Sequence, residues 1–505
     1  MSGEPAAPHA SDDSVFPDPV YRDTVLAPLF EDVKSHYAAH MATINRAHLV
    51  MLAECDILDP PSARSIAAAL AAIERETDVP SLAYTGEHED YFFLVESELR
   101  RRLGADAGGM LHTARSRNDM DHTVFKMALR ARTDALLAHA LGLAETLLDK
   151  ARVERDTPIV AYTHGQPAQP STFGHYLCAT LEVLQADVER LLVARAALDL
   201  CPMGAAAITT SGFPIDRARM ATLLGFAAPK RNSYGCIASV DYVTGLYSAL
   251  KLPFLHLGRV VQDMAFWSAF EVGQLHVPNS LVQISSIMPQ KRNPVPIEHL
   301  RHLASVTVGR CDTIVNTMHN TPFTDMNDSE GEVQAAGYAA FASGARVLEL
   351  AAALLGSVTI DVTRVRANGD AACVTITELA DTLVREEGLS FRQAHEVAAH
   401  TARAVIAAAR PLREGHAAFA RAFRHETGRA TALDPAAFAR AVAIETFVAR
   451  RDRFGGPAAT ALEEAFEHHA AVLEGQRLRV AAGPERTHRA GAALDDAFQS
   501  LFTGS

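Results

Sequence analysis

The sequence lacks the patterns that mark disulfide-bonded, nucleic-acid-binding and nucleotide-binding proteins. Its six cysteines are scattered, with no C-x-x-C pair, which indicates buried thiols in a reducing compartment rather than a disulfide framework. No block rich in lysine and arginine occurs and the formal charge is −13, which argues against binding to a phosphate backbone. No Gly-rich phosphate loop and no internal repeat stand out.

Segments that direct a chain to a membrane are also missing. Residues 1–13 are small and acidic rather than basic and then apolar, unlike a secretory signal. No uninterrupted apolar run approaches the roughly 20 residues that span a bilayer. We therefore expect a soluble cytoplasmic protein in which residues 1–19, rich in Ala, Pro, Ser and Asp, form a disordered tail.

Metal-binding motifs are not evident either. His395 and His400 lie five residues apart rather than four, so they would not share the face of a zinc-binding helix. We expect no metal and no cofactor.

Alternating strand patterns with tight Asn-Gly or Asp-Gly turns are nearly absent, whereas helical periodicity is common. Apolar residues recur at helical spacing in four long segments, 124–153, 172–198, 240–277 and 332–355, with a kink expected at Pro253 in the third. Helices of about 25–35 residues must pack on one another to bury their apolar stripes. The sequence predicts an all-α fold with a bundle of long helices. The stretch after residue 367 has shorter helical segments and more loop signals, which suggests a separate C-terminal domain.

Three polar loops interrupt these helices. Residues 285–294, SSIMPQKRNP, contain Pro289 and Pro294, which prevent a helical hydrogen-bond ladder. A serine oxygen here can take a proton next to a carboxylate, while the lysine and asparagine stabilise the charge that develops. Residues 112–119 (HTARSRND) and 163–170 (THGQPAQP) precede long helices, where free N–H groups favour an anion.

The first of these loops resembles the signature loop of the fumarase/aspartase superfamily, except that Ile284 stands where the pattern has Gly. The other two resemble the Ser-Arg-Asn-Asp and Thr-His segments of its argininosuccinate lyase branch. Further matches are residues 213–217, 383–387 and 391–395. The resemblance implies a mostly helical subunit of three domains, an N-terminal helical domain (20–114), a central long-helix bundle (115–366) and a C-terminal helical domain (367–505). It also implies a homotetramer with a 20-helix core. Each active site of that family is formed by three regions from different subunits.

The resemblance also implies a chemistry, the reversible elimination of an amine from an N-substituted L-aspartate to give fumarate through an aci-carboxylate intermediate. Ser285 is then the base, acidified by Lys291, with Ser286 the alternative by proximity. His164, paired with Glu298, either protonates the departing amine or positions it. The residues expected to bind the fumarate carboxylates are Ser116, Arg117, Asn118, Thr163, Ser286, Met288 and Asn293.

The part of the site that holds the amine departs from the arginine-releasing pattern. Members that release arginine carry Tyr, Gln and Lys where ungapped matching places Pro322, Asn327 and Glu330. Replacing a cation by an anion reverses an interaction worth about 4 kcal/mol at 4 Å and an effective dielectric of 20. With Asn45 and Phe92, which replace a serine and a histidine of the pattern, Asn327 and Glu330 are the candidates for the amine side.

We therefore expect the amine to be a diamine or an amine-bearing aspartate, as in ethylenediamine-disuccinate (EDDS) lyase, rather than arginine. The alternatives are a true argininosuccinate lyase, a fumarase or cycloisomerase on the same scaffold, and a non-catalytic helical protein of the kind recruited as lens crystallin. The Ser-Arg-Asn-Asp segment argues against the fumarase or cycloisomerase, and retention of Ser285, His164, Lys291 and Glu298 argues against the crystallin.

Overall fold

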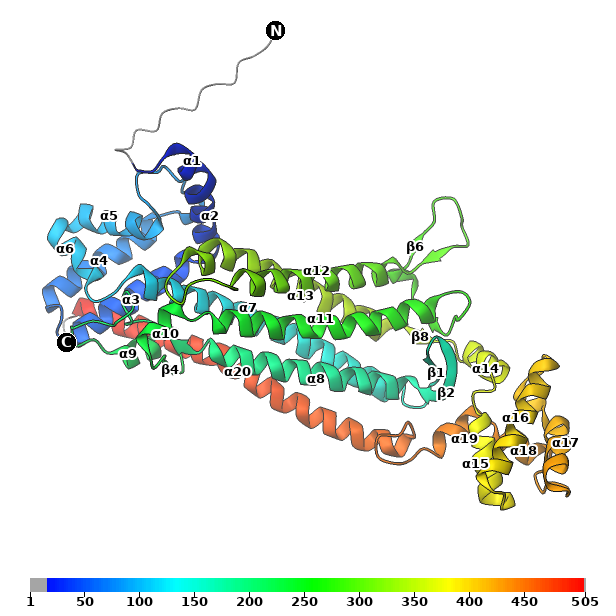
Figure 1. The fold of residues 1–505 in the computed structure, drawn as a ribbon. Coiled ribbons are helices and arrows are strands. Elements are labelled where there is room, and N and C mark those ends of the chain that lie inside the picture. Colours follow the sequence, from blue (N-terminus) through cyan, green and yellow to red (C-terminus); the bar gives the residue numbers. More distant parts are fainter. Residues whose placement is uncertain (1–15, 504–505) are drawn as a thin grey trace, which may run out of the picture.

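The computed structural model describes residues 16–503, so most of the tail expected at 1–19 lies outside the described residues. The described chain is almost entirely helical (Figure 1). Its strands form four two-stranded sheets. This confirms the all-α class.

Five long helices form the central bundle and lie side by side along one axis (Figure 1). They are α7 (Arg117–Val153), α8 (Phe173–Ala197), α11 (Asp241–Ser268), α12 (Val295–Thr317) and α13 (Gly331–Ser357). The four predicted segments coincide with four of these helices. The third ends at Ser268 instead of residue 277, because Ala269 is extended and Gly273 adopts a positive φ of 63°.

Helix α13, with the short turn that precedes it, is the one described element long and apolar enough to cross a membrane by length and composition. Its apolar surface packs against α7 and α12, and half of its most apolar stretch is buried within the subunit. Its composition is therefore that of a helix in the core of the bundle.

The N-terminal helices pack at the end of the bundle where α7 begins (Figure 1). They are α1 (Pro19–Tyr21), α2 (Ala27–His36), α3 (Ala38–Glu54), α4 (Pro60–Glu76), α5 (Tyr91–Leu103) and α6 (Ala105–Gly109), with a π-helical turn at Arg22–Leu26 and 3-10 turns at Val79–Ser81 and Met110–His112. Their buried side chains, such as Phe30 and Leu49, belong to the same hydrophobic core as the bundle.

Six helices lie at the opposite end. Helices α15 (Ile376–Glu387), α16 (Phe391–Ala407), α17 (His416–Thr427) and α18 (Pro435–Ala441) pack around a second core that includes Phe419, Phe423 and Phe438. Helices α14 (Val362–Ala371) and α19 (Ile444–Ala449) contribute Val365 and Ile444 to a small separate cluster.

The last helix, α20 (Ala459–Thr503), leaves this second core and runs back along α7 and α8 as far as α3 and α4 (Figure 1). Our prediction that the C-terminal domain extends to residue 505 is therefore wrong for these 45 residues. The cause is an apolar stripe at helical spacing, including Leu462, Phe466, Leu473 and Val480, which the main core buries. The remaining domain boundaries stay predictions.

Short strands and helices complete the two ends. Strands β1 (Pro158–Thr163) and β2 (Gln166–Thr172) form a hairpin, as do β6 (Gln283–Ile284) and β7 (Arg292–Asn293). The pairs β3 (Leu200–Cys201) with β4 (Ala228–Pro229) and β5 (Leu275–His276) with β8 (Thr359–Ile360) join distant segments. Helices α9 (Arg217–Leu223) and α10 (Ser233–Ala238) and 3-10 turns at Asn279–Leu281, Asn327–Ser329 and Leu412–Glu414 lie in connecting segments.

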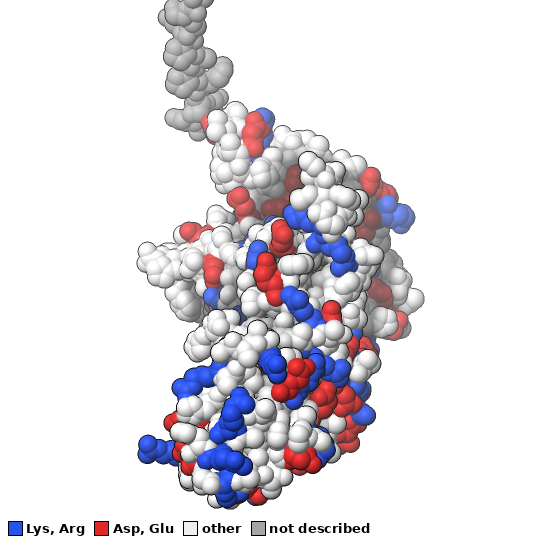
Figure 2. Space-filling view, turned by 90° about the vertical axis from the view of Figure 1, so that its right-hand side faces the viewer, with Lys and Arg blue, Asp and Glu red and all other residues white. Residues whose placement is uncertain are grey.

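Basic and acidic side chains are interspersed over the end of the molecule that Figure 2 shows. A mixed distribution of this kind differs from the continuous basic face of a nucleic-acid-binding protein.

Candidate active site

The Ser-Arg-Asn-Asp segment forms the first turn of α7, and a capping box holds it there. The Ser116 side chain caps the helix, and the Ser116 backbone N–H donates to Asp119 Oδ1 at 3.0 Å. The other oxygen of Asp119 accepts from the backbone N–H groups of Gly204 and Ala206, at 2.8 and 2.9 Å. Burial raises the pKa of Asp119 to about 6, although these three hydrogen bonds oppose the rise. Asp119 thus anchors a distant loop beside the predicted carboxylate-binding residues.

Arg117 and Asn118 face a cavity, and both have partners within the subunit. Arg117 Nη1 lies 2.8 Å from carboxylate oxygens of both Glu89 and Asp90. Burial works against the charge of Arg117, but these two carboxylates outweigh it and raise its pKa. Asn118 donates from its side-chain amide to the carbonyl oxygen of Ala207 at 3.2 Å.

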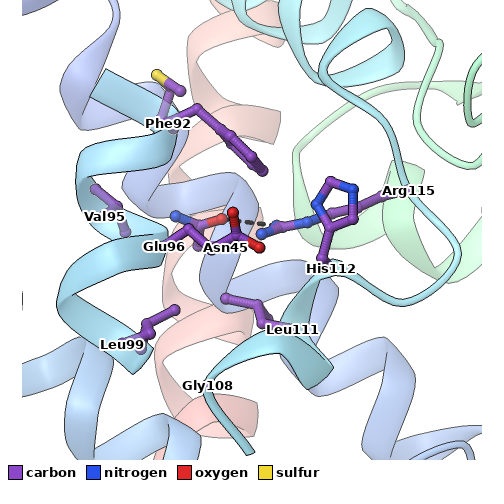
Figure 3. A pocket seen from close by; sticks show the side chains of 10 residues that line it. Asn45, Phe92, Val95, Glu96, Leu99, Gly108, Leu111, His112 and Arg115 are labelled. Atoms are coloured by element: carbon purple, nitrogen blue, oxygen red, sulfur yellow. Dashed lines mark hydrogen bonds between the residues drawn. The ribbon is translucent and has the colours of Figure 1, made fainter. Parts of the chain in front are cut away.

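Asn45 does not line this cavity. It is buried, and its Oδ1 accepts a 2.7 Å hydrogen bond from Arg115, whose guanidinium lies over the Phe92 ring (Figure 3). The space between them is a cavity of only about 10 Å³, too small for an amine ligand. Asn45 also lines a separate cavity of about 570 Å³ beside α4 and the last helix, while Phe92 lines both the small space and the larger cavity.

The larger cavity, called the acidic cavity below, has a volume of about 550 Å³. It lies between the N-terminal helices, the start of α7 and the segment before α13. One side is apolar, with Phe30, Phe92 and Phe125 among its residues. The charged residues that line it are one guanidinium, Arg117, and six carboxyl groups, Glu89, Asp90, Asp121, Asp325, Glu330 and Glu332. Asn118 and Asn327 line it as well, so predicted fumarate-side and amine-side residues share one cavity.

The acidic groups of this cavity crowd one another, and their protonation changes as a result. Burial, followed by the charge of Asp90, raises the pKa of Asp121 to about 8. Burial and the carboxyl groups of Asp121 and Asp325 raise the pKa of Glu330 to about 9. At neutral pH the cavity therefore holds protons that a bound cation can displace.

Asp121, His122 and Asp325 are not among the site residues that we predict from the sequence. Asp121 and His122 lie three and four residues after Asn118 in α7, on the same helical face, and this spacing was a usable signal. No comparable signal connects them with Asp325, because about 200 residues separate the two segments in the sequence.

The signature loop is the tip of the β6–β7 hairpin, which extends from the far end of the bundle (Figure 1). Ser285 Oγ accepts hydrogen bonds from the backbone N–H groups of Ile287 and Met288, at 3.4 and 3.0 Å. Such amide donors favour the ionised oxygen that a serine base requires. Ser286, Met288 and Lys291 lie exposed on the same loop, and Asn293 is half-buried at its base.

Ile284, which replaces the glycine of the family pattern, pairs with Arg292 in this hairpin and is 87% exposed. Arg292 in turn donates to the carbonyl oxygen of Val277 and to Asn279 Oδ1, at 2.7 and 2.8 Å. The base of the loop is thus fixed, while most residues of its polar tip are exposed on this subunit.

The Thr-His segment forms the turn of the β1–β2 hairpin. His164 and Gly165 both adopt positive φ values, 54° and 73°, as a two-residue hairpin turn requires. Thr163 and His164 are exposed at the tip. Glu298 is exposed in the first turn of α12, and no hydrogen bond or ion pair joins it to His164 within residues 16–503. The predicted pairing of these two residues is therefore absent from the single subunit and stays a prediction for an assembly.

The three polar regions lie at two ends of the subunit. Arg117 begins α7, whereas both hairpins lie at the opposite end of the bundle (Figure 1). The 37 residues of α7 span about 55 Å at 1.5 Å per residue. One subunit alone therefore does not bring Ser285, His164 and Arg117 together.

The fold and these loops define a class, that of helical lyases in which a polar loop with Ser, Lys and Asn interrupts a bundle of long helices. A family model described as "Lyase" matches residues 31–309, and one described as "Argininosuccinate lyase C-terminal" matches residues 373–449. Argininosuccinate lyase 2 of Agrobacterium fabrum is 61% identical over 460 residues, 91% of each chain. Argininosuccinate lyase of Methanothermobacter thermautotrophicus is 32% identical over 86% of this chain and 92% of its own.

Among solved structures, EDDS lyase in complex with formate covers 95% of both chains with a TM-score of 0.82 and 27% identity. The chain belongs to the argininosuccinate lyase branch of the fumarase/aspartase superfamily. It is a carbon–nitrogen lyase of the fumarate-releasing class.

Proposed function

We propose that this enzyme eliminates fumarate from an N-substituted L-aspartate whose departing amine is a diamine rather than arginine. The observation that carries the proposal is the composition of the large cavity, in which six carboxyl groups accompany a single guanidinium. A second ammonium group on the amine would be attracted to this cavity, whereas a carboxylate would be repelled.

The proposed active unit is a homotetramer. If bundles of four subunits pack together, their five long helices give a 20-helix core, and one subunit's hairpins reach the Arg117 end of another. Exposed apolar side chains on the bundle, among them Val183, Leu255 and Val306, support such packing. The six cysteines are free thiols, which agrees with the proposed cytoplasmic location.

In this assembly the fumarate half of the site uses residues from all three regions. Ser285 removes the proton next to the carboxylate, with its oxygen stabilised by the two loop amides. Lys291 and Asn293 from the same loop, with Ser116, Arg117, Asn118 and Thr163 from the other regions, stabilise the dianion that develops. His164, oriented by Glu298 in the assembly, protonates or positions the departing nitrogen.

Arg117 is already paired with Glu89 and Asp90, so a substrate carboxylate must compete with these two acids or share the guanidinium with them. Sharing is feasible because only one of the terminal nitrogens makes both contacts, which leaves other N–H donors of the guanidinium for a ligand.

Argininosuccinate is the second candidate substrate, and the 61% identity to a protein named argininosuccinate lyase 2 favours it. Its arginine carries an α-carboxylate, which would meet Asp325 and Glu330 if it bound in the acidic cavity. A bound argininosuccinate would therefore have to place this carboxylate elsewhere.

The test is fumarate consumption by the purified enzyme with ethylenediamine, longer diamines or arginine, followed by ultraviolet absorbance. The proposal predicts consumption with a diamine and little with arginine. Consumption with arginine alone would assign the enzyme to argininosuccinate instead. Light scattering of the same sample tests the tetramer.

A further inference from the structure

Three polar groups from separate segments converge at one end of the acidic cavity. His122 lies in the second turn of α7, Asp325 in the loop after α12, and Glu330 immediately before α13. One donor atom from each of the three lies within 4.8 Å of the other two. Asp325 and Glu330 line the cavity itself.

His122 provides the observation that points to a ligand. Its side chain is 1% exposed, and its Nε2 has no hydrogen-bond partner among the described residues. Asp325 Oδ1, 3.9 Å away, is likewise buried without a partner in that part of the chain. Buried polar atoms in native proteins nearly always have partners, so two orphaned atoms that face each other indicate a missing one.

Burial lowers the pKa of His122 to about 4, so the imidazole is neutral at physiological pH. Its Nδ1 lies 3.1 Å from the Tyr242 hydroxyl. In the tautomer whose Nδ1–H donates to this oxygen, Nε2 carries a free lone pair 3.9 Å from Asp325 Oδ1. The three groups then present three hydrogen-bond acceptors and no donor other than a carboxyl proton.

We propose that His122, Asp325 and Glu330 form a receptor for a primary ammonium group, the distal amine of the departing diamine, a role that rests on the function proposed above. A primary ammonium has three N–H donors, one for each acceptor. With N–H···O distances of about 2.8 Å and tetrahedral angles, its acceptors lie about 4.6 Å apart.

A transition-metal ion is the alternative ligand for these three residues. Metal–ligand bonds of about 2.1 Å place tetrahedral ligands about 3.4 Å apart, and the 3.9 Å between His122 Nε2 and Asp325 Oδ1 lies between this spacing and that of the acceptors of an ammonium. The cavity is also continuous with Arg117 and Asn118, so a ligand that is bound through its aspartate end can extend toward the receptor.

The test is a series of linear primary amines in the fumarate-consuming direction, each with a chain of two to five methylene groups and a different group at its far end. The far group is ammonium, methyl, trimethylammonium or carboxylate. The receptor predicts a kcat/KM at least about 100-fold higher for ammonium than for methyl. Trimethylammonium keeps the charge but has no N–H donor, so it should react less well than ammonium, and carboxylate should react least.

Variants show which residues produce the preference for a distal ammonium. His122→Leu and Asp325→Asn should each reduce the preference for ammonium over methyl at least tenfold, and Glu330→Gln should reduce it about fivefold at pH 7 and more at pH 9, while Asp328→Asn, an exposed acid of the same segment, should not. His122→Asn, which keeps an acceptor, should restore part of the preference. A variant that fails to fold would lose the reaction with both amines and its thermal transition, so the remaining variants decide the matter.

The outcomes separate the two proposals. Fumarate consumption with no preference for ammonium would overturn the receptor and leave the elimination standing. No consumption with any amine would overturn the proposed function itself. Retention of Zn²⁺ or Mn²⁺ after dialysis by the wild type, but not by His122→Leu, would assign the three residues to a metal instead.

Discussion

Replacing Glu330 by glutamine should weaken diamine binding, and the effect should increase with pH. An ionised Glu330 about 4 Å from an ammonium contributes about 4 kcal/mol at an effective dielectric of 20. The pKa of Glu330 is about 9, so at pH 7 removal of its proton costs about 3 kcal/mol. The difference between these two energies is what the ionised Glu330 contributes to binding at pH 7. Because each 1.4 kcal/mol corresponds to a tenfold change in affinity, Glu330→Gln should raise the KM for the diamine about fivefold at pH 7 and a few hundredfold at pH 9.

The charged groups that face Glu330 determine the direction of this pH dependence and the pH range in which it is seen. Glu330 faces Asp121 and Arg117 of α7 and the preceding Asp325. The pKa of Asp121 is about 8, so it releases its own proton in wild type and variant alike. Since the pKa of His122 is about 4, it stays neutral throughout. Between pH 7 and 9, a plot of log(1/KM) against pH should therefore be steeper for the wild type than for Glu330→Gln. The two slopes should differ by up to one, which corresponds to one proton.

Initial rates at saturating fumarate, with the diamine varied between pH 6.5 and 9.5, measure this difference. Asp328→Asn is the matched control, because it removes an exposed charge from the same segment. Identical pH slopes for the wild type and Glu330→Gln would refute the reasoning, since they would show that the Glu330 proton is not exchanged for the amine.

Three further predictions concern the base, the loop anchor and stability. Ser285→Ala should lower kcat by at least about 10³-fold with an unchanged tetramer in light scattering, whereas Ser286→Ala should retain activity; the opposite result would make Ser286 the base. Asp119→Ala removes the acceptor of three backbone amides and should lower the free energy of unfolding by about 3 kcal/mol, measured by urea titration, with Asp328→Ala as an exposed control. Glu330 has a folded pKa of about 9 against an ordinary value of 4.5, so wild-type stability falls as pH rises between these values; in calorimetry Glu330→Gln should raise the unfolding temperature at pH 8.5 and leave it nearly unchanged at pH 5, and a constant difference would contradict the pKa.

The long helices could be predicted because apolar spacing alone specifies them, and the start of α7 is visible in the Ser116-x-x-Asp119 capping box. Helix α20 has equally regular spacing, yet the sequence does not state which core its stripe will join. We assigned it to the domain nearest in sequence, whereas it packs on the bundle. Periodicity predicts that a face is buried but not what covers it.

The site shows the same division between local and long-range information. The polar residues of each loop could be selected as candidates because each motif is contiguous, and their catalytic roles stay predictions. The acidic cluster could not be, since it depends on the approach of α7 to the segment before α13. A position within a motif does not by itself say what the side chain contacts. Asn45 was a candidate for the amine side because of its place in a motif, and in the structure its side chain accepts a hydrogen bond from buried Arg115.

The most direct test of the account is a crystal structure of the Ser285→Ala enzyme soaked with fumarate and the best diamine of the series. We predict fumarate held between Arg117 of one subunit, the 285–293 loop of a second and His164 of a third, with the far nitrogen of the diamine within about 3 Å of Asp325 and Glu330. Fumarate bound within a single subunit, or hairpins that lie far from every Arg117 in the tetramer, would contradict it.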